Sequence, residues 1–432
     1  MDLTKQFTKG ILEKVVFKLK CGATIDLDPS FVSKLVIYES MSQPGVTGLI
    51  EITDYQQLVS YDGSGCGGIA VGDEVQIAYR SGDETGQDPR IAKNFLIYHV
   101  QDYGLDERYE FNKVTIRFCS KWLIPALCGG CPPKYWKNKR ASDAIIDVLS
   151  SCGCPFGKTD KTKIKHEIIV APTCWSPLAF AWYYLSREES ESFHAKNWVL
   201  YESLHVGVIM CTKKEIIQRN AEIFGVLSDD FIELNFKNTF WKGNAVLMEY
   251  KSLLDATTLF HGLFNSYAQG LWYDTDELWE VGIKAVSECD DRHVTEAFPM
   301  NSGLGMSIPK SIKQVGAYPQ KTKKLTFEEF HKPLISYVEH TAGKTYSDVV
   351  KLVVQVPLST KRKCGQFIHV NVLRPNKKKP TYDMRLTGCY YMHTIMTVFE
   401  AQKAYQFIVL TQDGYHKARP DMVTWKNWFC PV

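Results

Sequence analysis

The residues with the clearest potential for chemistry are closely spaced cysteines. Four of the thirteen cysteines form two pairs about twenty residues apart, Cys128 with Cys131 and Cys152 with Cys154. Two close thiol pairs at that separation could hold a tetrahedral zinc ion. However, one residue separates the second pair, where zinc knuckles usually have two or more. Free thiols, or disulfides formed after release to an oxidising environment, compete with the zinc interpretation, so no metal site is assigned.

Other segments that resemble catalytic motifs lack the neighbouring residues that the motif requires. The glycine-rich stretch 62–68 is not followed by Lys-Ser or Lys-Thr, and no helical pattern begins after it, as a phosphate-binding loop requires. Segment 303–307 lacks the second flanking glycine of a hydrolase nucleophile elbow. Paired aspartates lie in polar turns, and no His-Glu-x-x-His motif occurs. We therefore expect neither an enzyme nor a bound cofactor.

Two segments are candidates for partner binding. A basic loop with Lys377, Lys378 and Lys379 lies between two predicted strands; it is either a solvated hairpin tip or a surface facing nucleic acid or an acidic partner. The C-terminal segment 415–432 concentrates aromatic residues where chains are usually frayed. These aromatics either pack back onto the fold or dock on a partner, and docking is favoured. The residues concerned are Trp425, Trp428 and Phe429.

Composition is that of an ordinary globular protein. Hydrophobic residues make up 45% and charged residues 23% of the 432, and the formal charge is +3. So small a charge gives no reason to expect a nucleic-acid binder. No stretch approaches the roughly 20 apolar residues of a membrane span, and the first ten residues lack the apolar core of a signal peptide. The sequence therefore predicts folding in a cytoplasm without membrane insertion by this chain.

Strand and helix patterns predict the elements that would position these residues. Residues 1–120 read as short strands with one buried face, typical of a small barrel or sandwich. Residues 121–225 have mixed α+β character. Within them we expect a helix at 141–151 capped by Ser142, a second helix at 177–190 and a hairpin at 198–210.

The layout of residues 72–118 recurs at 365–413. In both copies a glycine precedes one strand, and two further strands follow with similar lengths and turn positions. The predicted fold is therefore mainly β with α+β inserts and contains two similar antiparallel β-barrel domains. The expected boundaries are 1–120 for the first barrel, 121–225 for the α+β insert, 226–255 with 345–414 for the second barrel, 256–344 for a mixed insertion and 415–432 for the tail.

The chain resembles the baseplate hub family of contractile-tailed phages, which is akin to the hub portion of type VI secretion spike proteins. The resemblance is structural, covers most of the chain and contains no catalytic signature. The cysteine count and the aromatic tail depart from the family pattern. The segments that carry the resemblance are 35–54, 72–74, 95–100, 177–182, 200–207, 352–357, 365, 383–391 and 411–414.

The resemblance implies a structural protein of the virion tail baseplate. Family members form a homotrimer in which two barrels per chain make a pseudo-sixfold ring. Such a ring is a symmetry adaptor between a trimeric central spike and the hexameric tail tube or its initiator proteins. It encloses a channel for the tape measure protein and for DNA in transit during genome ejection. Assembly in the cytoplasm of an infected bacterium is implied. The alternatives are a hub or spike component of a non-phage contractile injection system, or a zinc-binding module.

Overall fold

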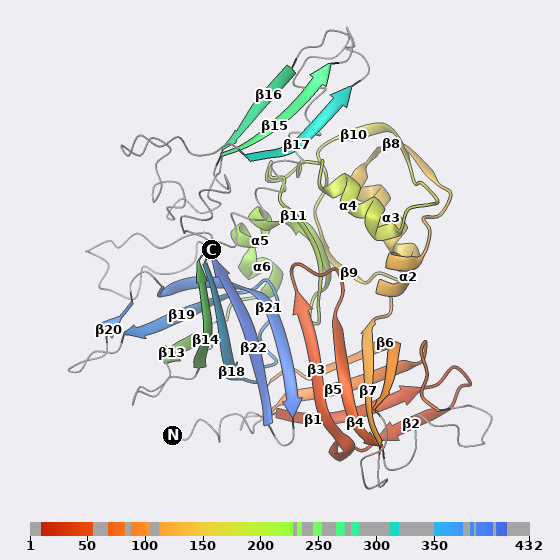
Figure 1. Ribbon diagram of the computed structural model, residues 1–432, viewed down its shortest axis with the longest axis vertical. Coiled ribbons are helices and arrows are strands. Elements are labelled where there is room, and N and C mark those ends of the chain that lie inside the picture. The colour runs from red at the N-terminus through yellow and green to blue at the C-terminus, as the bar shows by residue number, and fades with distance from the viewer. Residues whose placement is uncertain are drawn as a thin grey trace.

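The computed structural model is dominated by β-strands, as the sequence predicts (Figure 1). It describes residues 10–54, 68–82, 88–103, 112–227, 231–235, 245–252, 350–374, 381–383, 386–400 and 403–412, together with the strands 265–272, 278–284 and 311–318. One sheet of 14 strands runs through the molecule. We call β1–β7 the first half, residues 121–225 the insert, and the strands β13, β14 and β18–β22 the second half.

The first half is antiparallel throughout, in the order β2-β1-β5-β6-β7-β4-β3. The predicted alternation holds in β5, where Val75, Ile77 and Tyr79 point into the core. Within the described ranges no pairing joins β3 to β1 or β2, so closure of this half into a barrel stays a prediction. The bounds are β1 Gly10–Lys18, β2 Thr24–Leu27, η1 Pro29–Phe31, β3 Val32–Ser40, β4 Thr47–Asp54, β5 Glu74–Ser81, β6 Ile91–Tyr103 and β7 Asn112–Ser120.

The insert combines helices with two small sheets. Strand β10 pairs with β8, and β12 lies between β11 and β9. The helices α2, α3 and α4 lie together in Figure 1. The bounds are α2 Leu123–Cys128, β8 Tyr135–Arg140, α3 Ala141–Ser151, β9 Phe156–Thr159, β10 Lys165–Val170, α4 Pro177–Leu185, β11 Trp198–Ser203, β12 Gly207–Thr212, α5 Lys213–Gln218 and α6 Asn220–Phe224.

Two details of the predicted insert are wrong. Ser142 does not cap α3; the N-cap is Arg140, and the buried Ser142 hydroxyl accepts a bond from the Thr162 N–H (3.2 Å). Helix α4 ends at Leu185 rather than at residue 190. It ends there because side chains of the next two residues, Ser186 and Arg187, donate to a carbonyl of its last turn. The predicted hairpin is confirmed as β11 and β12.

The second half departs from the expected antiparallel pattern at one strand. β13 pairs parallel with both β14 and β19. It enters the sheet from the helical end of the insert rather than through a tight hairpin from another strand of the sheet, so no short turn fixes its direction as antiparallel. The pairings β21-β22-β18-β14-β13-β19 return to β21. The bounds are β13 Phe231–Asn235, β14 Ala245–Ser252, β18 Val350–Pro357, β19 Phe367–Arg374, β20 Thr381–Tyr382, β21 Gly388–Glu400 and β22 Lys403–Gln412.

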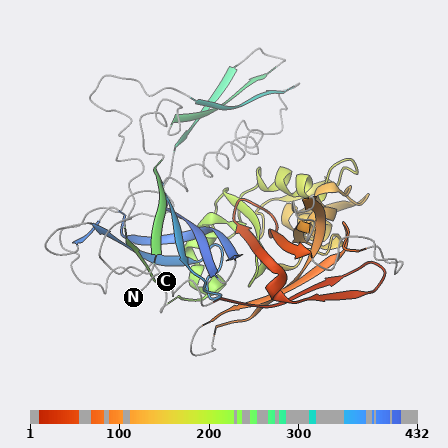
Figure 2. The same cartoon turned by 60° about the horizontal axis from the view of Figure 1, so that its bottom comes forward.

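Residues between β14 and β18 contribute a separate three-stranded sheet, which stands away from the large sheet in Figure 2. β15 lies between β16 and β17, pairing antiparallel with the first and parallel with the second. The bounds are β15 Asn265–Trp272, β16 Leu278–Lys284 and β17 Ser311–Tyr318.

The predicted internal repeat is present in the backbone hydrogen bonds. Gly72 and Gly365 both adopt φ +91°, a left-handed conformation that glycine tolerates best. The Gly72 N–H donates to the Ile97 carbonyl (2.8 Å), and the Gly365 N–H donates to the Met392 carbonyl (2.8 Å). Immediately after these carbonyls, β6 and β21 each contain a register shift against the next strand. The two halves therefore repeat each other down to single hydrogen bonds.

One strand pairing joins the halves into a continuous sheet. β3 pairs antiparallel with the C-terminal part of β21, from Ser40 opposite Thr394 to Lys34 opposite Glu400. The Ser40 and Thr394 hydroxyls are also 2.9 Å apart and hydrogen-bonded. We call this pairing the seam.

Candidate functional site

The β11–β12 hairpin of the insert lies against the seam, where β11 contacts the seam strand β3. Every residue of β11 is buried. Since successive side chains of a strand point to opposite faces, the hairpin serves two cores at once. Val199 and Tyr201 pack into the core of the second half, whereas Trp198 and Leu200 pack into the core of the insert. The hairpin therefore contributes side chains both to the core of the insert and to the core of the second half.

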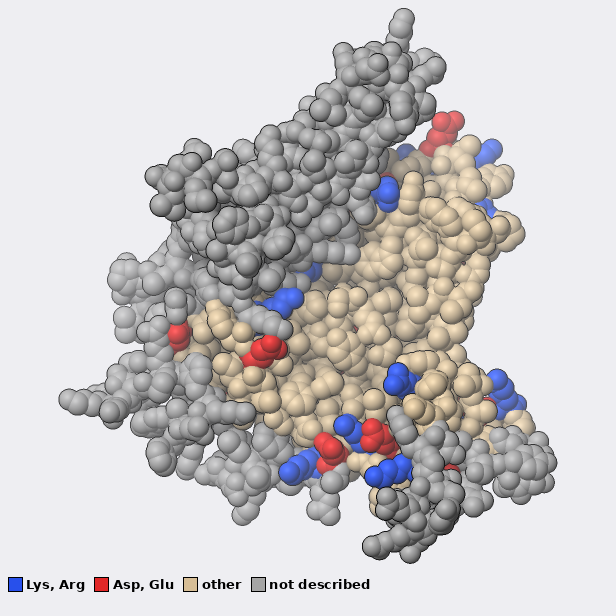
Figure 3. Space-filling view, in the orientation of Figure 1, with Lys and Arg blue, Asp and Glu red and all other residues tan. Residues whose placement is uncertain are grey.

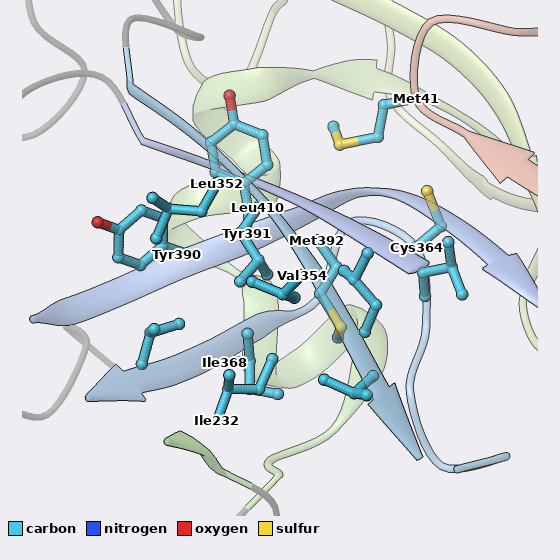
Figure 4. Close-up of a cluster of buried hydrophobic side chains, with 14 of the residues drawn as sticks. Met41, Ile232, Leu352, Val354, Cys364, Ile368, Tyr390, Tyr391, Met392 and Leu410 are labelled. Atoms are coloured by element: carbon cyan, nitrogen blue, oxygen red, sulfur yellow. The ribbon is translucent and has the colours of Figure 1, made fainter. Parts of the chain in front are cut away.

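The tip of the hairpin reaches the first half as well. Leu204, at the turn, belongs to the core of the first half. In the other direction Met41, just after β3, belongs to the core of the second half. Figure 4 shows Met41 facing the side chains of that core, among them Cys364 and Met392. Side chains of this hairpin and its turn therefore contribute to all three cores.

A buried carboxyl group lies at this meeting point. Glu39, on the seam strand β3, is 4% exposed and accepts a hydrogen bond from the Leu204 N–H (2.8 Å). Burial raises the pKa of Glu39 to about 8; the Leu204 N–H lowers it, nearby Glu202 raises it and Lys93 lowers it. Glu39 is therefore largely protonated at neutral pH, which avoids a charge inside the junction.

A second acidic side chain makes a buried contact within the insert and one bond to Val46 of the first half. Glu202, on β11, accepts from the Trp122 indole N–H (2.9 Å) and from the Val46 N–H (3.5 Å). Trp122 precedes α2 and is 2% exposed, so this contact is fully inside the protein. The arrangement binds structural elements to each other and presents no group to a substrate.

The insert also forms hydrogen bonds with the backbone around Gly365, the glycine of the second half that corresponds to Gly72. Asn220 donates to the Gly365 carbonyl (2.8 Å) and accepts from the Phe367 N–H (2.9 Å). The Tyr201 hydroxyl donates to the Cys364 carbonyl (3.2 Å). A Cβ on Gly365 would lie 2.1 Å from the Tyr201 oxygen. Glycine is thus required here by close approach as well as by its φ.

The four cysteines considered for zinc are free thiols in the insert. Cys128 is exposed, Cys152 is partly buried, and Cys131 and Cys154 are buried. Burial is the main cause that raises the pKa of Cys131, Cys152 and Cys154, which favours neutral thiols. In the part of the chain that the structure describes, no group of three or more His, Cys, Asp or Glu could hold a metal ion.

The two predicted partner-binding segments lie outside the described residues. This applies to Lys377, Lys378 and Lys379, and to the aromatics of the tail, Trp425, Trp428 and Phe429. On the face in Figure 3, basic and acidic side chains lie interspersed in the lower part of the tan surface, and others lie at its left and upper right. No helix among the described residues is long and apolar enough to cross a membrane.

Comparisons with known proteins give matches in structure alone. No family model and no curated protein sequence matches the chain. A 43 kDa tail protein of prophage MuSo2 from Shewanella oneidensis matches 93% of this chain and 98% of its own, with a TM-score of 0.53 and 8% identity. The chain has the fold of a prophage tail protein. This confirms, at the level of the fold, the resemblance to phage baseplate proteins.

A second tail protein, from Neisseria meningitidis MC58, shares the same fold. It matches 93% of this chain and 96% of its own, with a TM-score of 0.51 and 9% identity. A type VI secretion component of Escherichia coli matches 90% of this chain and 76% of its own at 8% identity, but its TM-score of 0.43 supports no inference. The tail-protein fold therefore spans nearly the whole chain, including the insert.

The residues that hold this tail-protein fold together at the junction were not predicted from the sequence. For Glu39 a signal was present, because it lies two and four residues after Ile37 and Leu35, on the buried face of the same strand. Asn220 carried no comparable signal, since its partners at 365 and 367 are distant in sequence.

Proposed function

We propose that the chain is the baseplate hub of a contractile phage tail. Three copies form a ring in which six similar halves surround a channel. The ring joins a trimeric central spike to the hexameric tail tube or its initiator proteins. The tape measure protein, and then DNA, passes through the channel during genome ejection. The role is structural, and the chain makes or breaks no bond.

The observation that carries this proposal is the repeat within one continuous sheet. Two halves share the Gly72 and Gly365 hydrogen bonds, and the seam joins them through seven residue pairs. A chain with two similar units can present a threefold surface and a sixfold surface once three copies assemble. The prophage tail-protein fold supports a place in the tail.

The junction supports a mechanical role. Sheath contraction would load the ring, so the halves of each chain must hold a fixed orientation. Hydrogen bonds along the seam and the hairpin shared by three cores oppose rotation of one half against the other. The domain bounds proposed with this function are those predicted from the sequence, with 226–255 and 345–414 forming the second barrel.

Native mass spectrometry of the purified full chain tests the proposal. The expected mass is three times 49.3 kDa, and addition of a purified central spike trimer from the same virion should give one complex of three and three. A chain that remains monomeric at micromolar concentration would refute the hub. Six-membered rings of single chains would refute the two-halves argument.

A further inference from the structure

Equivalent positions in the two halves can be assigned by following strand partners outward from the repeat glycines. In the first half the row runs from Gly72 through Ile97, Phe118 and Gly48 to Ile37. In the second half it runs from Gly365 through Met392, Leu410 and Leu352 to Tyr250. Tyr250 in β14 therefore corresponds to Ile37 in β3. By the same rows, the C-terminal part of β6 corresponds to the C-terminal part of β21.

Within one chain, the seam is formed by one strand from each of these two pairs of corresponding strands. It is made by β3 and by the C-terminal part of β21. The equivalents, β14 and the C-terminal part of β6, do not pair with each other in one chain. In Figure 1 they lie on opposite sides of the large sheet, with β14 beyond β18 and β6 beyond β7.

Among the described strands, each of these two equivalents has an edge that strand pairing covers only in part. The pairing of β5 with β6 ends at Leu96, and two further backbone bonds, one with Gly72 and one with Asp73, reach Ile97. Past that residue no described strand pairs with this edge of β6. The pairing of β13 with β14 covers only Ala245 and Val246. A sheet edge of this kind is a template for pairing with another chain.

Large apolar side chains are exposed on these same strands. Tyr98 on β6 is 38% exposed, and Met248 and Tyr250 on β14 are 46% and 42% exposed. Ile37, the seam residue equivalent to Tyr250, is 1% exposed. The repeat thus places on β14 a partly exposed tyrosine whose counterpart is buried by the seam. Burial of Tyr250 by a second chain would give it the same environment as Ile37 has in the seam.

We propose that β14 of one copy pairs antiparallel with β6 of the next copy, in the register of the seam. This places Val100 opposite Ser252, Gln101 opposite Lys251, and Asp102 opposite Tyr250. The occupant of each edge is a second copy of this chain, because only this chain carries the seam geometry that the register repeats. The contact is heterologous, so it closes into a ring when the rotations sum to a full turn. The proposal rests on the trimeric hub and specifies how its copies join.

An engineered disulfide across the predicted register tests this pairing. Opposite residues of antiparallel strands have Cα atoms about 4.5–5.5 Å apart, within disulfide reach. The full chain carrying Gln101→Cys and Lys251→Cys should, under mild oxidant, form covalent species of up to three chains that a reductant dissolves. Wild type and each single variant, treated identically, set the background from the thirteen native cysteines.

Lys351 supplies a matched control. It is the partner of Lys251 on the neighbouring strand β18, so it lies one strand further from the copy. At roughly 4.8 Å of extra separation it is beyond disulfide reach of Gln101. Gln101→Cys with Lys351→Cys should therefore stay at background, which separates register-specific linking from random oxidation.

The outcomes separate this inference from the hub proposal. A trimeric wild type whose Gln101→Cys, Lys251→Cys variant does not cross-link would overturn the register and leave the trimer standing. A monomeric wild type would overturn both. Should that variant fail to assemble under reducing conditions, Val100→Cys with Ser252→Cys tests the same register one position along, and absence of linking there counts against it equally.

Discussion

Replacing Glu39 by glutamine should remove a pH dependence from the stability of the protein. Glutamine keeps the oxygen that accepts from the Leu204 N–H and cannot ionise. In the wild type the folded-state pKa of Glu39 is about 8, compared with an ordinary value of 4.5. The folded state therefore binds a proton that the unfolded state releases between these two pH values. Stability from this group is complete below about pH 4.5 and is lost as the pH rises through about 8.

The magnitude follows from the same two pKa values. Each pH unit between them costs about 1.4 kcal/mol, so the 3.5-unit interval from 4.5 to 8 corresponds to at most about 5 kcal/mol. Between pH 5.5 and 7.5 the wild type should lose about 3 kcal/mol relative to Glu39→Gln. Glu39→Ala should be destabilised at every pH, because the buried Leu204 N–H then has no acceptor.

Urea unfolding of both proteins at several pH values between 5 and 9 measures this difference. The free energy of unfolding of Glu39→Gln minus that of the wild type should rise steadily up to about pH 8 and then level off. Glu51→Gln, on the neighbouring strand β4, controls for the loss of any carboxylate. Parallel pH profiles for the wild type and Glu39→Gln would refute the buried, protonated Glu39.

Three further predictions concern the junction, the cysteines and the tail. Gly365→Ala should lower the free energy of unfolding by at least about 2 kcal/mol, because it combines a positive φ with a clash against Tyr201. Gly22 has the same φ and open space around it, so Gly22→Ala should cost only about 1 kcal/mol in the same urea titration. Elemental analysis of purified protein should find zinc well below one ion per chain, and stoichiometric zinc lost on replacing Cys128 and Cys131 by serine would contradict the free-thiol description. Deleting residues 415–432 should leave the assembly at three chains but weaken spike binding at least tenfold in a pull-down titration; unchanged binding would show that the tail aromatics do not dock there.

Local patterns predicted much of this fold, and long-range contacts account for what they missed. Short β-branched runs and glycine positions were enough to place the hairpin at 198–210 and the repeat at 72–118 and 365–413. The parallel pairing of β13 depends on where the chain enters the sheet, which no local pattern encodes. The role of Ser142 likewise depends on Thr162, twenty residues away.

The seam also could not be predicted from local sequence patterns. The sequence predicts that β3 and β21 are strands, but only the structure shows that they pair across more than 350 residues. Burial of Glu39 follows from that pairing together with the hairpin tip. The candidate site could therefore be predicted as strands and not as a junction. The roles of the basic loop and of the tail in partner binding remain predictions.

Cryo-electron microscopy of the purified full chain would show the arrangement of its copies. We expect a closed ring of three chains around an open channel, with six similar halves and with β14 of each chain running beside β6 of the next. A compact monomer, or a ring whose copies meet through other surfaces and leave these two edges exposed, would contradict it.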